Sequence, residues 1–287
     1  MYTPTVNIIG AGRLGKTLAK LMVLKKTATI AGVYNKNVKN SLDAIEFIGE
    51  GIPCTSFKQL PDADLYFLTV PDALISSVIN ELLEYNKPKP GKIFIHCSGV
   101  SSSEILSPVK NWGGYLASLH PSITIAHPET TTKKFTGTYC AIEGDHEAVT
   151  VLFELCEKIG GKPYLINQQN KAAYHSAGVF STNYLITLAQ TSIECLEQAG
   201  VDQDQALDIV ITYMQSALTN LSVLHSTKQA LTGPLKRGDV MTVQKNLQSL
   251  KEKTKELYQI LGQLTLNLIE HQNKETELEL LNELSKK

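Results

Sequence analysis

Arginine is scarce in this 287-residue chain: of its 27 basic residues, Arg13 and Arg237 are arginine and the other 25 are lysine. An excess of positive charge is missing as well, because 28 acidic residues bring the formal charge to -1. We therefore expect no nucleic-acid partner. Since lysine supplies the general surface charge, we interpret the two arginines as places that need a planar, bidentate cation.

Long apolar runs and cysteine motifs are also absent. Apolar residues make up 43% of the chain but never form the run of about 18 that spans a membrane. The five cysteines are widely spaced and include no CxxC pair, so we expect reduced thiols and no disulfide framework or metal site. The first residues lack the signals of a leader peptide. Together these absences predict a cytoplasmic protein that binds no membrane.

A glycine-rich turn lies near the start of the chain. Residues 5–9 and 29–34 predict two strands, with an amphipathic helix between them. In that context Gly10 allows a tight turn, Gly12 lets the backbone approach a pyrophosphate, and Gly15 lets the helix pack on the strand. The alternative is an ordinary strand–turn–helix without a ligand. The predicted contacts with a dinucleotide are Gly10, Gly12, Arg13, Leu14 and Gly15.

The end of the second strand distinguishes NAD from NADP sites. A NAD site places Asp or Glu there to accept hydrogen bonds from the ribose 2′-hydroxyl. Here the segment Asn35-Lys36-Asn37-Val38-Lys39 has no carboxylate. A cationic, amide-rich segment suits a 2′-phosphate, so we predict NADP, with Lys36 as the phosphate partner and Asn35 nearby. The alternative for these lysines is a solvated turn.

Strand and helix signals alternate through the first half of the chain. The predicted elements are strands at 64–70, 92–96, 115–119 and 163–166 and helices at 73–83 and 147–159. This alternation predicts a parallel, doubly wound sheet. Ligands of such sheets bind at the carboxyl ends of the strands. Three residue pairs would meet at that edge: Val70-Pro71, Ser98-Gly99 and His120-Pro121.

The second half is expected to be helical. We predict two domains, residues 1–166 for the dinucleotide and 167–287 for substrate and dimerisation. The predicted elements of the second are a helix at 171–198, one from Asp202 to about Leu224, a loop at 232–238 and a long helix capped by Asp239. A heptad spacing along that last helix predicts packing against another helix, in this chain or in a homodimer. Its members are Val243, Leu247, Leu250, Thr254, Leu257, Leu261, Leu264 and Leu268.

Candidate catalytic groups begin at the joint between the domains. Lys171 and His175 are four residues apart, so they share one stripe of the helix with Gly178 and Thr182. An amine and an imidazole on that stripe could face a nicotinamide, because pockets tend to form at domain joints. The alternative is a solvated lysine beside a surface histidine.

Three other side chains are candidates for binding a substrate. His120 follows a strand and is fixed by a proline, Ser98 could orient a substrate oxygen, and Arg237 could hold a carboxylate through two hydrogen bonds. For each, a purely structural role is the alternative. His127 and His225 are expected to be structural or solvent-facing.

Several segments, in this order, resemble one bacterial family: Gly10–Gly15, Leu68–Asp72, His96–Gly99, Leu119–Pro121, Lys171–His175 through Asn183–Leu185, and Leu231–Pro234 through Arg237–Asp239. Its members pair a Rossmann-like NADP-binding domain with a helical domain of unknown function. They are part of the β-hydroxyacid and 6-phosphogluconate dehydrogenase-like group, and many are described as coenzyme deazaflavin-dependent NADP oxidoreductases. The resemblance implies an α/β fold, a doubly wound Rossmann domain followed by an all-α 6-phosphogluconate-dehydrogenase-like domain.

Two related groups suggest roles for individual residues. Lys171 is similar to the acid/base lysine of β-hydroxyacid dehydrogenases, although His175 stands where they have an asparagine. Ser98 and His120 are placed like a serine and a histidine of prephenate dehydrogenases, whose histidine bonds the hydroxyl being oxidised. The glycine-containing segment that follows there is replaced here by Ser122-Ile-Thr, which argues against prephenate as the substrate.

We therefore expect an NADP-dependent oxidoreductase that moves a hydride between the nicotinamide and a carbonyl or hydroxyl carbon of a small, anionic metabolite. Lys171 or His120 would donate or accept the proton. The alternatives are an NADP-binding sensor without catalysis and an imine reductase similar to pyrroline-carboxylate reductase. The expected catalytic residues are Lys171, His120, His175 and Ser98, and the substrate-binding residues are Ser98, Gly99, Asn183 and Arg237; Val70 and Pro71 complete the cofactor site.

Overall fold

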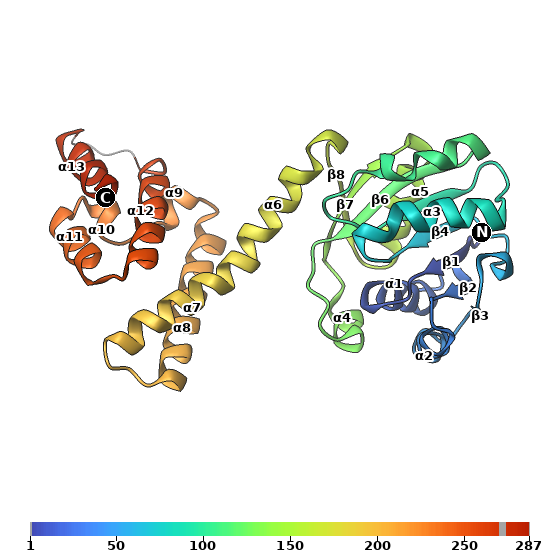
Figure 1. Cartoon of the computed structure of the whole chain (residues 1–287), viewed down its shortest axis with the longest axis horizontal. Helices are drawn as coiled ribbons and strands as arrows, with labels where there is room; N and C mark the ends of the chain where they lie inside the picture. Colours follow the sequence, from blue (N-terminus) through green and yellow to red (C-terminus); the bar gives the residue numbers. More distant parts are fainter. Residues whose placement is uncertain (1, 270–273, 287) are drawn as a thin grey trace. The chain divides into compact units, whose positions relative to one another are not determined.

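The computed structural model describes residues 2–269 and 274–286, and these form two compact units, 1–179 and 180–287. In Figure 1 the first unit runs from blue to green and the second from yellow to red. The first unit extends past the expected boundary at 166 because the start of the next helix packs against the sheet. Within the described residues, no helix has the length and apolar character needed to cross a membrane.

The first unit is built on one eight-stranded sheet with the order β3-β2-β1-β4-β5-β6-β7-β8. All strand pairings are parallel except that of β6 with β7. The expected doubly wound Rossmann fold is thus confirmed, with one antiparallel pairing that was not expected. The strands are β1 (Thr5–Ile9), β2 (Thr29–Tyr34), β3 (Ile52–Cys54), β4 (Leu65–Leu68), β5 (Ile93–His96), β6 (Tyr115–Pro121), β7 (Tyr139–Gly144) and β8 (Lys162–Leu165).

Helices connect these strands. The α-helices are α1 (Arg13–Leu24), α2 (Val38–Ile48), α3 (Ile75–Asn86), α4 (Pro128–Lys134), α5 (His146–Lys158) and α6 (Lys171–Ser181). Four 3-10 segments accompany them, η1 (Phe57–Gln59), η2 (Asp72–Leu74), η3 (Ser103–Trp112) and η4 (Gln168–Asn170).

The core of this unit lies on both faces of the sheet. Successive residues of β4 alternate between two apolar clusters: Phe67 belongs to the cluster that includes residues of α1, α2 and α5, and Leu68 to the one that includes residues of α3 and η3. Because both faces are covered, the central strands are almost continuously apolar. Polar chemistry is therefore confined to the ends of the strands, apart from a few buried groups.

The second unit consists of helices in the residues that the structure describes. They are α7 (Asn183–Gln198), α8 (Gln203–Leu224), α9 (Thr227–Ala230), α10 (Pro234–Arg237), α11 (Val240–Ser249), α12 (Glu252–Leu266) and α13 (Lys274–Ser285). The expected caps are confirmed, because Asp202 and Asp239 accept hydrogen bonds from backbone amides at the starts of α8 and α11. The expected loop at 232–238 contains α10, since proline is well suited to the first position of a helix.

Two expected helices are interrupted. Thr182, at φ -124° and ψ -67°, separates α6 from α7, so residues 171–198 are not one helix. Leu250 adopts an extended backbone at φ -89° and ψ 145°, which divides the predicted heptad helix into α11 and α12. The prediction of one continuous heptad helix is therefore wrong. Val243 and Leu247 instead share a buried cluster with Leu280 of α13.

Candidate cofactor site and active site

The glycine turn between β1 and α1 shows which glycines the fold itself requires. Gly10 has φ +88°, and a Cβ there would lie 2.6 Å from Val70 Cγ1. A Cβ on Gly15 would collide with Thr69 Oγ1. For Gly12 the nearest atom is Gly10 O at 3.9 Å. The missing side chain of Gly12 therefore leaves open space, which is what close approach of a phosphate requires.

A cavity of about 610 Å³ opens beside this turn. Gly12, Arg13 and Lys16 line it, together with Asn35 at the end of β2. The backbone N and the Nδ2 of Asn35 both donate to Ser41 Oγ, at 3.0 and 3.2 Å, which fixes this residue. The two cations and the start of α1 make this wall suitable for an anion. The carboxylates of Asp43, Glu46 and Glu129 also line the cavity.

The other expected cofactor contacts have different surroundings. Lys36 is exposed and is not part of the cavity lining. Leu14 packs against the core cluster that includes α1, and Val70 against the other cluster. Pro71 caps η2 at the end of β4. Of these four, the structure places Val70 beside Gly10, within the glycine turn.

Ser98 is the centre of a small hydrogen-bond network after β5. Its Oγ donates to Asp72 Oδ2 at 2.7 Å and accepts from the amides of Val100 and Ser101, at 3.2 and 3.0 Å. The side chain is also buried. Ser98 thus holds the turn in shape and ties it to Asp72, and its hydroxyl proton is already donated.

Three expected residues converge at Gly99. A Cβ on Gly99 would lie 2.9 Å from His120 Nε2 and 2.7 Å from His175 Cδ2. The backbone of Gly99 therefore lies close to both imidazoles, which come from β6 and α6. Only glycine fits here without displacing one of the rings.

His120 also has a partner that sequence reasoning did not single out. Tyr174 Oη lies 2.7 Å from His120 Nδ1, and the two rings meet edge to face at a centroid distance of 5.6 Å. Burial, followed by the charges of Lys171 and His175, lowers the pKa of His120 to about 4. Burial raises the pKa of Tyr174 to about 12. Both side chains are therefore uncharged near neutral pH.

Lys171 lies beneath this site rather than in it. Its side chain is 1% exposed, and its Nζ is 3.1 Å from Glu143 Oε1 and hydrogen-bonded to Ser118 Oγ. Glu143 also accepts from Ser103, from the backbone N at 2.9 Å and from Oγ at 2.6 Å. Burial lowers the pKa of Lys171, and the carboxylate of Glu143 opposes that effect. The two charges thus satisfy each other inside the protein.

Glu143, Tyr174 and His96 are the functional candidates that the sequence did not reveal. Tyr174 lies within the segment that carries Lys171 and His175, so a helical projection of that segment could have included it. Glu143 is the acidic residue of β7, a strand that was not predicted. His96 is fully buried, accepts from Ser98 N at 3.1 Å through Nδ1, and has no hydrogen-bond partner for Nε2 among the described residues.

The remaining expected substrate residues belong to the second unit. Asn183 begins α7 and Arg237 ends α10, and both are exposed.

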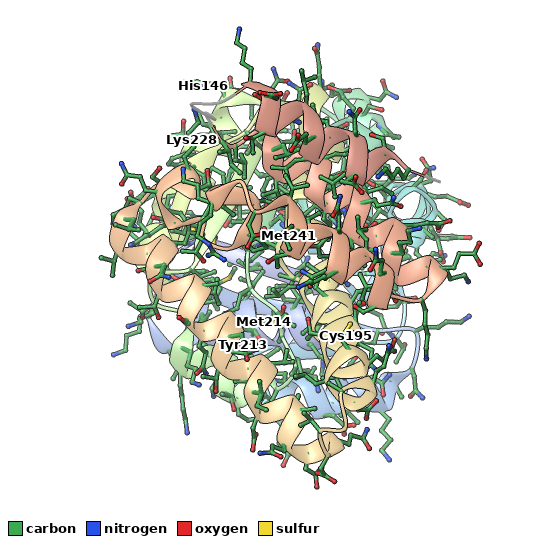
Figure 2. All side chains as sticks on the ribbon, turned by 90° about the vertical axis from the view of Figure 1, so that its left-hand side faces the viewer. His146, Cys195, Tyr213, Met214, Lys228 and Met241 are labelled. Atoms are coloured by element: carbon green, nitrogen blue, oxygen red, sulfur yellow. The ribbon has the colours of Figure 1, made fainter. Side chains whose placement is uncertain are left out.

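The second unit also has its own apolar cavity of about 360 Å³, to which Cys195 of α7 and Tyr213 of α8 contribute. Figure 2 labels both residues on their paired helices.

Two family models match the chain. A Rossmann-like domain is matched over residues 3–121, and a domain of unknown function, DUF2520, over residues 138–265. The second match begins at β7, so it includes Glu143 and Lys171 together. No curated protein matches the chain.

Solved structures share the fold. Protein TM1727 from Thermotoga maritima is 24% identical with a TM-score of 0.74, covering 92% of this chain and 97% of that one. An imine reductase from Streptomyces aurantiacus is 13% identical with a TM-score of 0.61, covering 85% and 86%. A reductive aminase from Aspergillus terreus, in complex with NADPH and ethyl-5-oxohexanoate, is 14% identical with a TM-score of 0.63, covering 88% and 90%.

Proposed function

We propose that this chain, which joins a Rossmann-like domain to a DUF2520 domain, is an NADP-dependent oxidoreductase acting on a carbonyl or hydroxyl carbon of a small, anionic metabolite. The observation that carries the proposal is Gly12, whose absent side chain leaves open space beside Arg13 and Lys16. NADPH, when bound there, supplies a hydride. Solved neighbours include a reductive aminase in complex with NADPH and a pyrroline carboxylate reductase with NADP bound, which supports the choice of cofactor.

The cofactor would be held mainly by the start of α1. Backbone amides after Gly12 and the side chains of Arg13 and Lys16 suit its phosphates. Lys36 and Asn35 are proposed to face the 2′-phosphate, because no carboxylate follows β2 directly.

We assign to His120 the role of donating or accepting the proton of the reaction. Its Nε2 lies beside Gly99 at the carboxyl end of the sheet, whereas the ammonium of Lys171 is buried against Glu143. His175 lies close to the same glycine and would help to orient the substrate. Lys171 then acts as a positioning residue that fixes the first turn of α6. Asn183 and Arg237 remain proposed contacts of the substrate, with Arg237 suited to a carboxylate.

A second candidate is the reduction of an imine, because solved neighbours include imine reductases and a pyrroline carboxylate reductase. A third is NADP binding without catalysis. Incubating the protein with NADPH and a panel of ketoacids, cyclic imines and a deazaflavin, while following absorbance at the nicotinamide band, would separate these candidates. NADPH binding without oxidation across the whole panel would favour the sensor.

The cofactor assignment has a direct test. In titration calorimetry, NADPH should bind at least tenfold more tightly than NADH. Lys36→Ala should reduce that preference, because it removes the charge facing the 2′-phosphate, while Lys39→Ala serves as a control with the same charge change. Equal or tighter binding of NADH would contradict the proposal.

We also propose a homodimer formed through the helical domain. Large apolar side chains are exposed on α7 and α8, among them Ile186 at 70%, Tyr213 at 66% and Val223 at 72%. So much exposed apolar surface on two adjacent helices is typical of a protein–protein interface.

A further inference from the structure

We propose that Tyr174 sets the tautomer of His120, so that the neutral imidazole carries its proton on Nε2 and donates it to the oxygen of the substrate's carbonyl group. This inference rests on the proposed function, in which His120 faces the reacting oxygen. It narrows the substrate class, because a hydrogen-bond donor at this position suits a carbonyl oxygen and opposes the N–H of an iminium.

The contact that carries the inference lies wholly within the first unit. Tyr174 on α6 approaches His120 on β6, with Oη 2.7 Å from Nδ1. The same Oη lies 3.2 Å from the Oγ of Ser122, which is exposed just after β6. Among the described residues, no hydrogen bond is made by His120 Nε2, the nitrogen beside Gly99.

The single proton of the phenol decides the arrangement. It can be donated to His120 Nδ1, to Ser122 Oγ or to the hydroxyl of the adjacent Tyr164. The imidazole nitrogen is a stronger base than either hydroxyl and lies closer than Ser122 Oγ, so the phenol donates to Nδ1, and the Ser122 hydroxyl can rotate to donate to Tyr174. A neutral imidazole has one N–H, which must then be on Nε2.

Burial and the surrounding charges keep the imidazole neutral. Burial disfavours a proton on His120 most, followed by the charges of Lys171 and His175, while Asp72 favours one. His96, from the neighbouring strand β5, is buried and also held neutral, with its pKa lowered to about 3 by burial and Lys171. Together these effects place the pKa of His120 at about 4, so the N–H donor persists at neutral pH.

The tautomer also provides a path for the proton. As the carbonyl carbon gains a hydride, its oxygen takes the proton from Nε2, and the phenol proton of Tyr174 moves to Nδ1. The phenolate left on Tyr174 accepts a hydrogen bond from Ser122. After the product leaves, Nε2 takes a proton from water and Nδ1 returns its proton to the phenolate, which restores the starting state with one proton taken from solvent. Tyr174 is thus a positioning residue that acts through His120.

Nitrogen NMR of ¹⁵N-histidine-labelled protein tests the proposal without a substrate. Spectra at pH 7 should show a protonated Nε2 and an unprotonated Nδ1 for His120, assigned by comparison with His120→Gln. Tyr174→Phe keeps the ring but removes the hydroxyl, so it should give a mixture of tautomers. Tyr139→Phe, a matched loss of one hydroxyl on β7, should leave the spectrum unchanged.

A proton on Nδ1 in the wild-type protein would overturn the proposal, as would an unchanged tautomer in Tyr174→Phe. Nδ1 protonation would make Nε2 an acceptor, which suits the N–H of an iminium instead. NADPH titration of the same samples tests the proposed function separately from the tautomer. If NADPH does not bind the wild-type protein, the proposed function is contradicted, whereas the tautomer of His120 is decided by the NMR spectra alone.

Discussion

At the scale of single residues, the pair formed by Lys171 and Glu143 has the largest expected effect on stability. Lys171→Met would leave a carboxylate that is 2% exposed without its cation. We expect a loss of about 3–5 kcal/mol in the free energy of unfolding, measured by urea denaturation. Lys158→Met, which breaks an exposed pair with Glu154, should cost under about 0.5 kcal/mol. Similar losses in both variants would contradict a buried ion pair.

Two buried histidines predict a loss of stability in acid. The pKa values of His96 and His120 are lowered to about 3 and about 4, so the unfolded chain binds more protons than the folded one between those values and about 6.5. The contribution of these two histidines to the free energy of unfolding should be fully present above pH 6.5 and should decline as the pH falls toward 4. Urea midpoints across this range would measure the slope.

The matched variants for this slope are His96→Asn and His225→Asn. The first removes one of the two titrating groups and should flatten the pH dependence. His225 is exposed at the end of α8 with φ +47°, which asparagine tolerates. His225→Asn should therefore leave the slope unchanged. An unchanged slope in His96→Asn would show that this histidine does not contribute.

At the scale of elements, the turn before α1 separates folding from binding. Gly12→Ala should leave the melting temperature of the free protein unchanged, because the new Cβ meets open space, yet it should weaken NADPH binding at least tenfold. Gly10→Ala should lower the melting temperature, because of its positive φ and its contact with Val70. Normal NADPH affinity in Gly12→Ala would move the cofactor away from this turn.

The elements also show what the sequence could and could not predict. The β1–α1 turn was predictable because its glycines and apolar periodicity depend on neighbours in the chain. The burial of Lys171 was not, because it depends on Glu143 from β7, an unpredicted strand that pairs antiparallel with β6. Likewise, the heptad spacing was real, but Leu250 adopts an extended backbone and divides the helix. Local patterns indicated elements, whereas long-range pairing decided which side chains meet.

At the scale of the whole molecule, the proposed homodimer can be tested by measuring the molar mass in solution. Light scattering after gel filtration should give twice the 31.5 kDa of one chain. Ile186→Glu, on the exposed apolar face of α7, should shift the protein toward the monomer. Leu42→Glu, on an exposed position of α2 in the first unit, should not. A monomeric wild-type mass would refute the proposed assembly.

The buried pair also determines where the chain can be divided. Glu143 lies on β7, and Lys171 lies beyond the end of the last strand, on α6. A fragment ending at residue 166 would keep the acid and discard the base, leaving an uncompensated carboxylate in its interior. An autonomous amino-terminal fragment should therefore extend through Val179, where the first compact unit ends.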